Sequence, residues 1–489
     1  MNKESIFDNH YKNEYILLKL LYISSREISK QEICEKLKIT LPTLSKIVSN
    51  IQNDFYDKLQ NSTIQFIVKR NTLKLQCEGN ISLDELATQL IKNSYKFKLL
   101  ETIFFNNNKR DNNLEIKLNI SNSTLNRVIN SCNQILLKYN LRIKKGRIEG
   151  SLTQYCYFYY MLFLIAPKKN TFSNQTTTKI LNAISNNMNI SVSNKKKLNL
   201  WIFLLIKNLK IKEKRNLTEI EKRNLKQTSK TKIFKQLKQL YIEETIINNT
   251  DEAETFAYFL CLFFVSFGIV SYSDAYLNLF RRENPAFELT NKIISLLRLT
   301  FVNINNSFEI VENNIFTLIA QLFYFNGKNF LIDTITTQYY KDIFNNSLKY
   351  AIAEKIVNDI IKPSKFFNID KINYIKENLP LCLYVLIPKN ELKVNIAILA
   401  MTSNWIMSSL LALIEKRLNT YQSIVISEYK TSKTYDLLVT DTDVNLEKNS
   451  KNFSYYYKVT AWGIDIDFDR VINLINDITL EKYYKYLQL

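Results

Sequence analysis

Residues 27–55 read EISKQEICEKLKITLPTLSKIVSNIQNDF, which is the pattern of a helix-turn-helix. Ser29, with Glu32 three residues later, predicts a capped start for the first helix. Thr40 is expected to cap the second helix, and Pro42 falls in its first turn, where a missing N–H costs little. The apolar residues of the second helix recur at the spacing of one helical face: Leu44, Ile47, Val48 and Ile51.

The opposite face of this second helix carries short polar side chains and one lysine. Such a face is suited to entering the major groove of double-stranded DNA, where it contacts phosphates and base edges. The alternative is an ordinary helical hairpin with a solvated face. The outer face comprises Thr43, Ser45, Lys46, Ser49 and Asn50, and all of these except Ser49 are candidate DNA contacts.

A second copy of the stretch lies 81 residues further along the chain. Ile39-Thr40 aligns with Ile120-Ser121, and residues 43–48 align with residues 124–129. The capping residue, the apolar stripe and the outward cation recur in register. By the same reasoning, the candidate DNA contacts of the second copy are Thr124, Asn126 and Arg127.

A hairpin pattern follows each copy. Residues 64–76 alternate around Arg70-Asn71, and residues 141–149 turn at Lys145-Gly146. A helix-turn-helix followed by a basic hairpin is the winged arrangement, and two winged modules in tandem indicate a nucleic-acid partner. The candidate contacts from the hairpins are Lys69, Arg70, Lys144, Lys145 and Arg147.

The chain has 489 residues, which predicts several domains rather than one core. Only six glycines and six prolines indicate a mainly α, multidomain protein. The formal net charge is +20, and residues 1–150 hold 24 basic against 15 acidic residues, which suits a polyanionic partner. Residues 195–238 hold 15 basic against 3 acidic residues. A solvated helix face is the favoured interpretation of the lysine-rich run 210–238, and a second contact with DNA phosphates is the alternative.

The cysteines and the apolar runs bear on localisation. Six scattered cysteines without a CxxC pair are interpreted as reduced thiols of a cytoplasmic protein, and no signal segment opens the chain. Residues 255–273 are uncharged for 19 residues, at the edge of what spans a membrane. A buried helix in a helical domain is the favoured interpretation, so no membrane insertion is expected. The cysteines are Cys34, Cys77, Cys132, Cys156, Cys261 and Cys382.

The rest of the chain changes character twice. Helical patterns fill two blocks, with a boundary at 281–285, and Pro380 and Pro388 are expected to mark a linker before the last segment. There, four short strand patterns alternate with helical ones, which predicts a small parallel α/β domain. The predicted domains are winged modules at 1–80 and 81–151, helical domains at 152–277 and 287–387, and an α/β domain at 393–489.

This order of domains resembles the Mga/AtxA family of transcription regulators of Gram-positive bacteria, which often control virulence or carbohydrate-linked genes. The residues that match best are the two helix-turn-helix copies and Arg147-Ile148-Glu149-Gly150, which leads into an apolar helix. The resemblance implies that the helical blocks are similar to phosphotransferase-system regulation domains. It also implies that the last domain is similar to an enzyme IIB component and serves in dimerisation.

The chain departs from that pattern at the phosphorylated positions. Regulation domains of this kind are phosphorylated on histidine, but the only histidine is His10, before the first module. Enzyme IIB carries a cysteine after its first strand, whereas the corresponding loop 401–404 reads MTSN and Cys382 precedes the strand. The regulatory domains are therefore expected to have lost phosphoryl transfer or to answer another signal.

The leading hypothesis is a DNA-binding regulator that works as a homodimer or larger homo-oligomer. No phosphate-binding glycine loop and no Cys/His metal spacing occurs, so we expect no enzymatic activity, cofactor or metal. Tyr455, Tyr456 and Tyr457, with Tyr483, Tyr484 and Tyr486, indicate a pairing surface in the last domain, unless they pack within that domain. The alternatives are an adaptor or transport-system regulator that has lost DNA binding, and a membrane-associated protein.

Overall fold

The computed structural model is mainly helical with a few small sheets, as the composition predicts. It forms two compact units, one of residues 1–281 with 324–331 and one of residues 282–323 with 332–489. The boundary at 281 falls in the segment where the sequence predicts a separation, and the five-domain division remains a prediction. The structure describes residues 3–24, 26–55, 63–79, 81–106, 113–167, 172, 174–188, 190–209, 217, 219–245, 249–269, 285–302, 307–327, 348–383, 385–388, 393–400, 404–418, 424–442, 452–460, 462 and 464–486.

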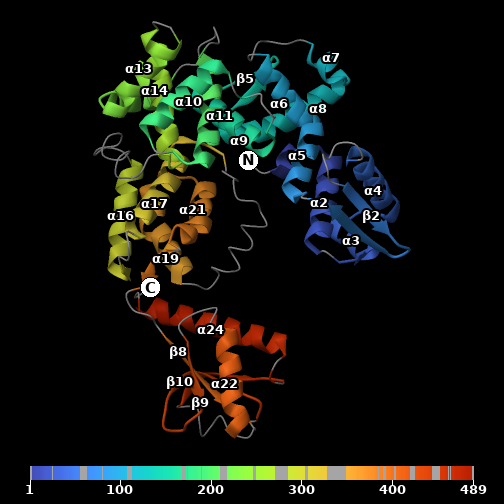
Figure 1. Ribbon diagram of the computed structural model, residues 1–489, viewed down its shortest axis with the longest axis vertical. Coiled ribbons are helices and arrows are strands. Elements are labelled where there is room, and N and C mark those ends of the chain that lie inside the picture. Colours follow the sequence, from blue (N-terminus) through green and yellow to red (C-terminus); the bar gives the residue numbers. More distant parts are fainter. Residues whose placement is uncertain are drawn as a thin grey trace. The chain divides into compact units, whose positions relative to one another are not determined.

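The first unit begins with a winged helix-turn-helix (Figure 1). Strand β3 pairs antiparallel with β2 on one side and with the two-residue β1 on the other, which ties the wing to the start of α3. The backbone of Lys69 donates to the Thr72 carbonyl at 3.0 Å and closes the wing turn. The elements are α1 (Lys3–Ile6), α2 (Asn9–Ser24), β1 (Ile28–Ser29), α3 (Lys30–Leu37), α4 (Leu41–Phe55), β2 (Thr63–Val68) and β3 (Thr72–Glu78).

The second module follows directly. Ser82 and Glu85 form a reciprocal capping box at the start of α5. Between β4 and β5, Lys145 and Gly146 both have positive φ, 49° and 72°, which is the two-residue hairpin turn that the sequence predicts. The elements are α5 (Leu83–Asn93), α6 (Tyr95–Phe105), α7 (Leu114–Leu118), α8 (Asn122–Leu136), η1 (Leu137–Tyr139), β4 (Arg142–Lys144) and β5 (Arg147–Glu149).

A helical domain completes the first unit. Helix α9 is apolar on all sides and is buried from Leu152 to Phe163, as an all-round hydrophobic helix requires. Trp201 of α11 stacks on Phe263 of α14, with ring centroids 4.8 Å apart. The elements are α9 (Leu152–Ile165), α10 (Gln175–Asn187), α11 (Val192–Leu209), α12 (Glu219–Thr228), α13 (Lys232–Thr245) and α14 (Thr250–Ser266).

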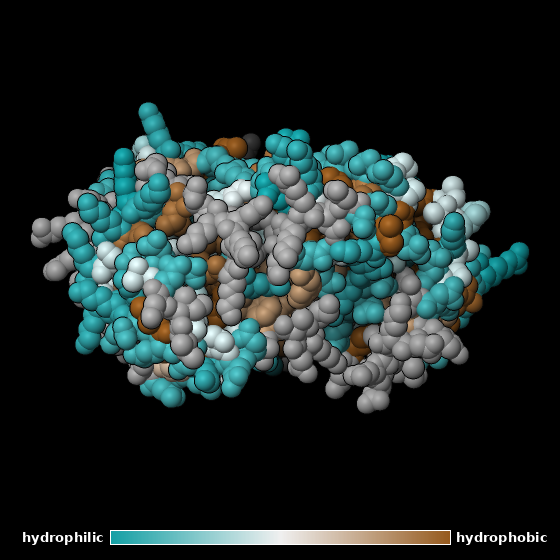
Figure 2. Space-filling model, turned by 90° about the horizontal axis from the view of Figure 1, so that it is seen from above, coloured by the Kyte–Doolittle hydropathy of each residue, from teal (hydrophilic) through white to brown (hydrophobic). Residues whose placement is uncertain are grey.

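The uncharged run 255–273 is described through residue 269, and most of it forms α14. That helix is buried from Phe256 to Ser266 within its domain, as the favoured interpretation of the run requires. None of the helices in the described ranges is long and apolar enough to cross a membrane. Figure 2 shows one face of the molecule, where hydrophilic side chains predominate and hydrophobic ones form separate small areas.

Residues 324–327 belong to the first unit and pack against α9 and η1. The Gln154 side chain donates to the Tyr324 carbonyl at 3.0 Å and accepts from the Asn326 backbone at 2.9 Å. Gly327 has φ of 87°, and a Cβ there would lie 2.4 Å from the Tyr139 ring. Both the left-handed backbone and the close approach to Tyr139 therefore require glycine at this position.

The first part of the second unit consists of helices and a two-stranded antiparallel ribbon, β6–β7. The prediction that Pro380 and Pro388 mark a linker is wrong. Pro380 lies in the last turn of α21, where its missing N–H removes only one helical bond, and Pro388 pairs with Phe301 in the β6–β7 ribbon. The elements are α16 (Pro285–Thr300), β6 (Phe301–Val302), α17 (Ser307–Tyr324), α19 (Leu348–Ile356), the π-helical turn η2 (Val357–Ile361), α20 (Lys362–Ser364), α21 (Ile369–Cys382) and β7 (Ile387–Pro388).

The last segment of the second unit is a parallel four-stranded sheet of order β11-β10-β8-β9. One face of the sheet, with Ile396, Ile398 and Leu437, packs against α22 and α24 in a single apolar core. The parallel strands agree with the predicted α/β domain. The elements are β8 (Val394–Leu399), α22 (Asn404–Leu418), β9 (Ile424–Glu428), β10 (Tyr435–Thr440), β11 (Phe453–Lys458) and α24 (Asp465–Tyr486).

Candidate nucleic-acid interface

The two helix-turn-helix copies share the turn and the second helix, although α3 spans eight residues and α7 five. Helices α4 and α8 both span 15 residues, and they begin at Leu41 and Asn122, 81 positions apart. The residue that ends the first helix of each copy is left-handed, with φ of 55° at Lys38 and 52° at Asn119. The bonds that close the two turns also correspond, and each measures 3.0 Å: Ile39 N to Cys34 O, and Ile120 N to Glu115 O.

The start of each second helix is held by hydroxyl groups in equivalent positions. The Thr40 and Thr43 hydroxyls lie 2.9 Å apart, and the Ser121 and Thr124 hydroxyls also lie 2.9 Å apart. The Ser121 hydroxyl additionally accepts from the Thr124 backbone at 3.3 Å, which is an N-cap bond. This agreement of side-chain bonds supports the predicted repeat beyond the match of apolar positions.

The start of α3 has one of the two hydrogen bonds that define a capping box. The Ser29 hydroxyl accepts from the Glu32 backbone at 3.1 Å, as predicted. The Glu32 carboxylate accepts from Lys36, one turn later, at 2.7 Å. That hydrogen bond, more than the field of the lysine charge, lowers the pKa of Glu32.

The predicted apolar stripe faces inward in both modules. In α4, Leu44, Ile47, Val48 and Ile51 are all buried. The corresponding buried positions of α8 include Leu125, Val128 and Cys132. Burial raises the pKa of the Cys132 thiol to about 12, so this cysteine is an apolar core residue rather than a reactive thiol.

Most of the opposite face of each helix projects outward, and two of its residues are half-buried. Thr43, Ser45, Lys46 and Ser49 of α4 and Asn126 and Arg127 of α8 are exposed, and Thr124 is half-buried. Asn50 is also half-buried, and its amide donates to the Glu14 carboxylate at 3.4 Å. The placement of Asn50 on the outer face is therefore wrong, because the buried carboxylate of Glu14 draws the amide inward.

The candidate wing residues differ in whether a carboxylate lies beside them. Arg70, Lys144 and Lys145 are exposed, and Lys69, also exposed, and Arg147 each lie beside a glutamate. Lys69 donates to Glu27 at 2.5 Å, and that bond is the largest cause of the lowered pKa of the Glu27 carboxyl. Arg147 is half-buried and lies 3.6 Å from the Glu149 carboxylate, so Lys69 and Arg147 have less charge to offer to a phosphate.

Sequence reasoning left two kinds of exposed residue off the list of candidates. Arg142 is exposed on β4 beside Lys144, and the basic hairpin pattern alone could have included it. Asn122 and Asn130 are exposed on α8. A period-of-four pattern of amides would have found them, whereas the search for cations and for matches between the copies did not.

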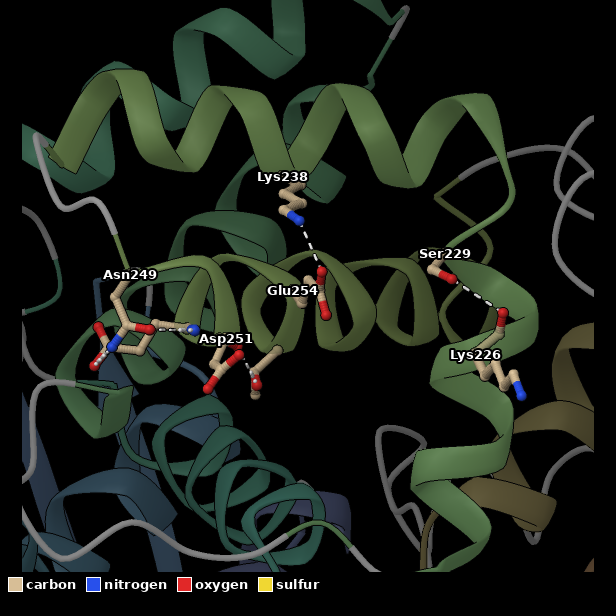
Figure 3. Close-up of polar contacts among 8 residues, drawn as sticks. Lys226, Ser229, Lys238, Asn249, Asp251 and Glu254 are labelled. Atoms are coloured by element: carbon tan, nitrogen blue, oxygen red, sulfur yellow. Dashed lines mark hydrogen bonds and ion pairs between the residues drawn. The ribbon is translucent and has the colours of Figure 1, made fainter.

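Most of the described part of the lysine-rich run lies on α12, on α13 and in the turn between them. Its exposed basic residues are Lys222, Arg223, Lys226, Lys230, Lys232 and Lys235. Lys238 instead turns toward α14, where it donates to Glu254 at 2.7 Å (Figure 3). The Ser229 hydroxyl donates to the Lys226 carbonyl at 3.0 Å between these helices (Figure 3). Both the solvated-face and the phosphate-contact interpretations agree with this placement.

Comparison with known families bears on the second module. Residues 79–163 match the Mga helix-turn-helix domain. The matched range begins just before α5 and ends within α9, so it contains α7, α8 and the β4–β5 wing. A Mga helix-turn-helix domain indicates a DNA-binding regulator. No curated protein matches the chain.

The first module lies outside the matched range. Its assignment rests on the equal length of α4 and α8, on the same left-handed turn at Lys38 and Asn119, and on the hydroxyl contacts at the start of α4 and α8. Among the residues that the structure describes, no group of three or more His, Cys, Asp or Glu side chains is placed to hold a metal ion.

Proposed function

We propose that this chain is a transcription regulator of the Mga type that binds promoter DNA through two winged helix-turn-helix modules. The observation that carries the proposal is the Mga helix-turn-helix match at 79–163, on a module whose turn and capping bonds recur 81 residues earlier. Both recognition helices place an exposed cation, Lys46 or Arg127, above a buried apolar stripe.

The charge distribution supports the same function. DNA binding is driven largely by release of counterions when lysine and arginine neutralise phosphates. Residues 1–150 carry 24 basic against 15 acidic residues. The exposed wing residues Arg70, Lys144 and Lys145 lie at the hairpin tips, where winged proteins contact the backbone beside the recognition helix.

The family resemblance extends the proposal to regulation and assembly. We assign the helical blocks to regulation-like domains and the last domain to an enzyme IIB-like module through which two copies pair. The parallel sheet supports the assignment of an enzyme IIB-like module. The tyrosines of β11 do not support pairing of two copies. Their hydroxyls bond within the domain: Tyr455 to Glu481, Tyr456 to Thr442 and Tyr457 to Asp467. The side chains of Tyr483, Tyr484 and Tyr486 lie outside the described residues.

The proposal places the protein in the cytoplasm and gives it no catalytic reaction and no cofactor. Because His10 is the only histidine, residues 152–387 offer no imidazole for phosphorylation. The runner-up function is an adaptor or transport-system regulator whose winged modules do not bind DNA. The match to a DNA-binding family favours the regulator.

Genome-wide occupancy of the tagged, full-length protein tests the proposal. Reproducible enrichment at sites upstream of genes is the expected result, and it should disappear in a Lys46→Ala/Arg127→Ala double variant expressed at the same level. Background recovery of DNA, together with a stable protein partner in the same pull-down, would establish the adaptor instead.

A further inference from the structure

The recognition helix of the second module carries a line of carboxamide side chains. Asn122, Asn126, Asn130 and Gln134 follow one another at intervals of four along α8, and all four are exposed. Intervals of four place neighbours on adjoining turns of one helical surface. The register-equivalent positions of α4 are Leu41, Ser45, Ser49 and Asn53, also exposed.

The two helices use these equivalent positions differently. In α8 the Asn126 amide donates to the Asn122 side-chain oxygen at 3.4 Å, so the two carboxamides lie side by side. In α4 the Ser45 hydroxyl donates to the Leu41 carbonyl at 3.2 Å, so its proton is used by its own helix. Leu41 presents an apolar side chain that is 55% exposed. In the first turns of the two helices, therefore, α8 projects two carboxamides from this surface, whereas the carboxamide of α4, Asn53, lies near its C-terminal end.

A carboxamide has a specific partner in the major groove. Its amide donor and carbonyl acceptor match N7 and the N6 amino group of adenine, whereas guanine presents two acceptors at the same edge. A serine hydroxyl or a leucine side chain does not form that bidentate pair. Beside the carboxamides, the Arg127 guanidinium donates to the Thr124 hydroxyl at 3.3 Å, which holds it toward the same end of the helix.

The spacing along the helix limits which carboxamides read bases. Four residues rise about 6 Å, which is close to two base-pair steps of about 3.4 Å. Each step of four also turns about 40° around the helix, so the line curves away from one groove. In helix-turn-helix proteins the N-terminal part of the recognition helix contacts base edges. Asn122 and Asn126, in the first turns of α8, are the members placed to do so.

We propose that the two modules divide the work of recognition, and that the second module reads adenines in the major groove through Asn122 and Asn126. The first module contributes phosphate contacts and little base preference. The preferred site is then an A·T-rich element under α8, flanked by DNA that α4 holds without a sequence requirement. This inference rests on the proposed function, because it takes both modules to bind DNA.

Replacement of individual adenines by 7-deazaadenine tests the inference. The probe is a duplex selected from a random pool by the full-length protein, and the modified base keeps Watson–Crick pairing but presents C–H in place of N7. We expect replacement of a contacted adenine to weaken binding roughly 3- to 10-fold, because one hydrogen bond is lost. Asn126→Ala should weaken binding to the unmodified duplex roughly 5- to 100-fold and should abolish the effect of 7-deazaadenine at one position.

Ser45→Ala, at the register-equivalent position of α4, is the matched control and should keep the full sensitivity to 7-deazaadenine. Protein that binds DNA but loses no affinity at any modified adenine, or that enriches no sequence from the pool, would overturn the inference and leave the proposed function standing. Failure to bind any duplex at low salt would overturn both. If Asn126→Ala does not fold, the modified-base series on the unaltered protein decides the question alone.

Discussion

Lys38 and Asn119 lie 81 residues apart in the chain and adopt the same left-handed backbone conformation, with φ of 55° and 52°. Each ends the first helix of a helix-turn-helix and directs the chain into the second helix. For most residues the left-handed region costs about 1–2 kcal/mol, whereas glycine enters it freely and asparagine enters it readily. The first module therefore holds a conformational cost at its turn that the second largely avoids.

Glycine at these two positions should separate the modules by stability. Lys38→Gly should raise the free energy of opening of the first module by about 1 kcal/mol, because glycine is the preferred residue where a helix ends in this conformation. Asn119→Gly should have a smaller effect. Hydrogen exchange of peptides covering residues 41–55 and 122–136 measures both. Lys36→Gly, inside α3, is the control and should lower protection by about 1 kcal/mol. A Lys38→Gly protein with lower protection than the unaltered chain would contradict this reading of the turn.

The outward cations of the recognition helices should be DNA contacts in equivalent positions. Lys46→Ala and Arg127→Ala each remove an exposed charge, so both should weaken DNA binding without lowering the thermal unfolding temperature. Loss of a base contact should cost about 1–3 kcal/mol, and loss of a phosphate contact should reduce the salt slope by about 1. Fluorescence anisotropy with a labelled duplex measures both effects. Lys416→Ala, an exposed lysine of α22, should change neither quantity. Unchanged affinity in both recognition-helix variants would remove their assignment.

Lys371 gives the second unit a pH-dependent term in its stability. Its ammonium group donates to the Leu322 carbonyl at 2.6 Å, and burial lowers its pKa from 10.5 to about 8. Between those two values the unfolded chain binds more protons than the folded chain, so this group's contribution to the free energy of unfolding rises with pH. Burial of the charged lysine therefore destabilises the folded unit fully below pH about 8, and this penalty disappears as the pH rises above 10.5.

Lys371→Met removes that titration. The free energy of unfolding of the methionine variant minus that of the unaltered protein should therefore fall as the pH rises from about 8 to 10.5. Urea denaturation midpoints of the two proteins across this range measure the difference. Lys365→Met, at the exposed residue that ends α20, is the control for replacement of a lysine by methionine, and its difference from the unaltered protein should depend less on pH than that of Lys371→Met. A constant difference between Lys371→Met and the unaltered protein would show that Lys371 does not titrate in this window.

Removal of residues 393–489 tests the proposal that two copies pair through the last domain. We expect the shortened protein to be mostly monomeric and to bind DNA weakly, because pairing lets two half-sites act together. Light scattering at micromolar concentration measures the mass. A truncated protein that stays dimeric would place the interface in the helical blocks.

The features that the sequence predicts well depend on near neighbours. The capping residues, the apolar stripe of α4 and the turn at Lys145-Gly146 are each specified within a few residues, so periodicity and turn chemistry were sufficient. The prediction that Asn50 lies on the outer face was wrong because its partner, Glu14, is 36 residues away and buried. Such a pairing has no local signal.

The misplaced prolines have a similar cause, and so does the weak sequence pattern of helix α10. Pro380 and Pro388 are accommodated by the last turn of a helix and by pairing with Phe301, which only the folded chain brings near. Helix α10 lies in a polar, asparagine-rich segment, where Ile180 and Ile184 are its fully buried apolar positions. Two positions on one face are too few to predict a helix from periodicity.

Binding of the full-length protein to a labelled duplex across a range of salt concentrations tests the central claim, that this chain binds DNA through its winged modules. Each neutralised phosphate contributes about −0.9 to the slope of log affinity against log salt. Contacts from Lys46, Arg127 and the exposed wing residues Arg70, Lys144 and Lys145 should together give a slope of about −4 or steeper. Tight binding at low salt with that slope is the predicted result. Absence of binding at low salt, or an affinity that does not change with salt, would contradict the claim.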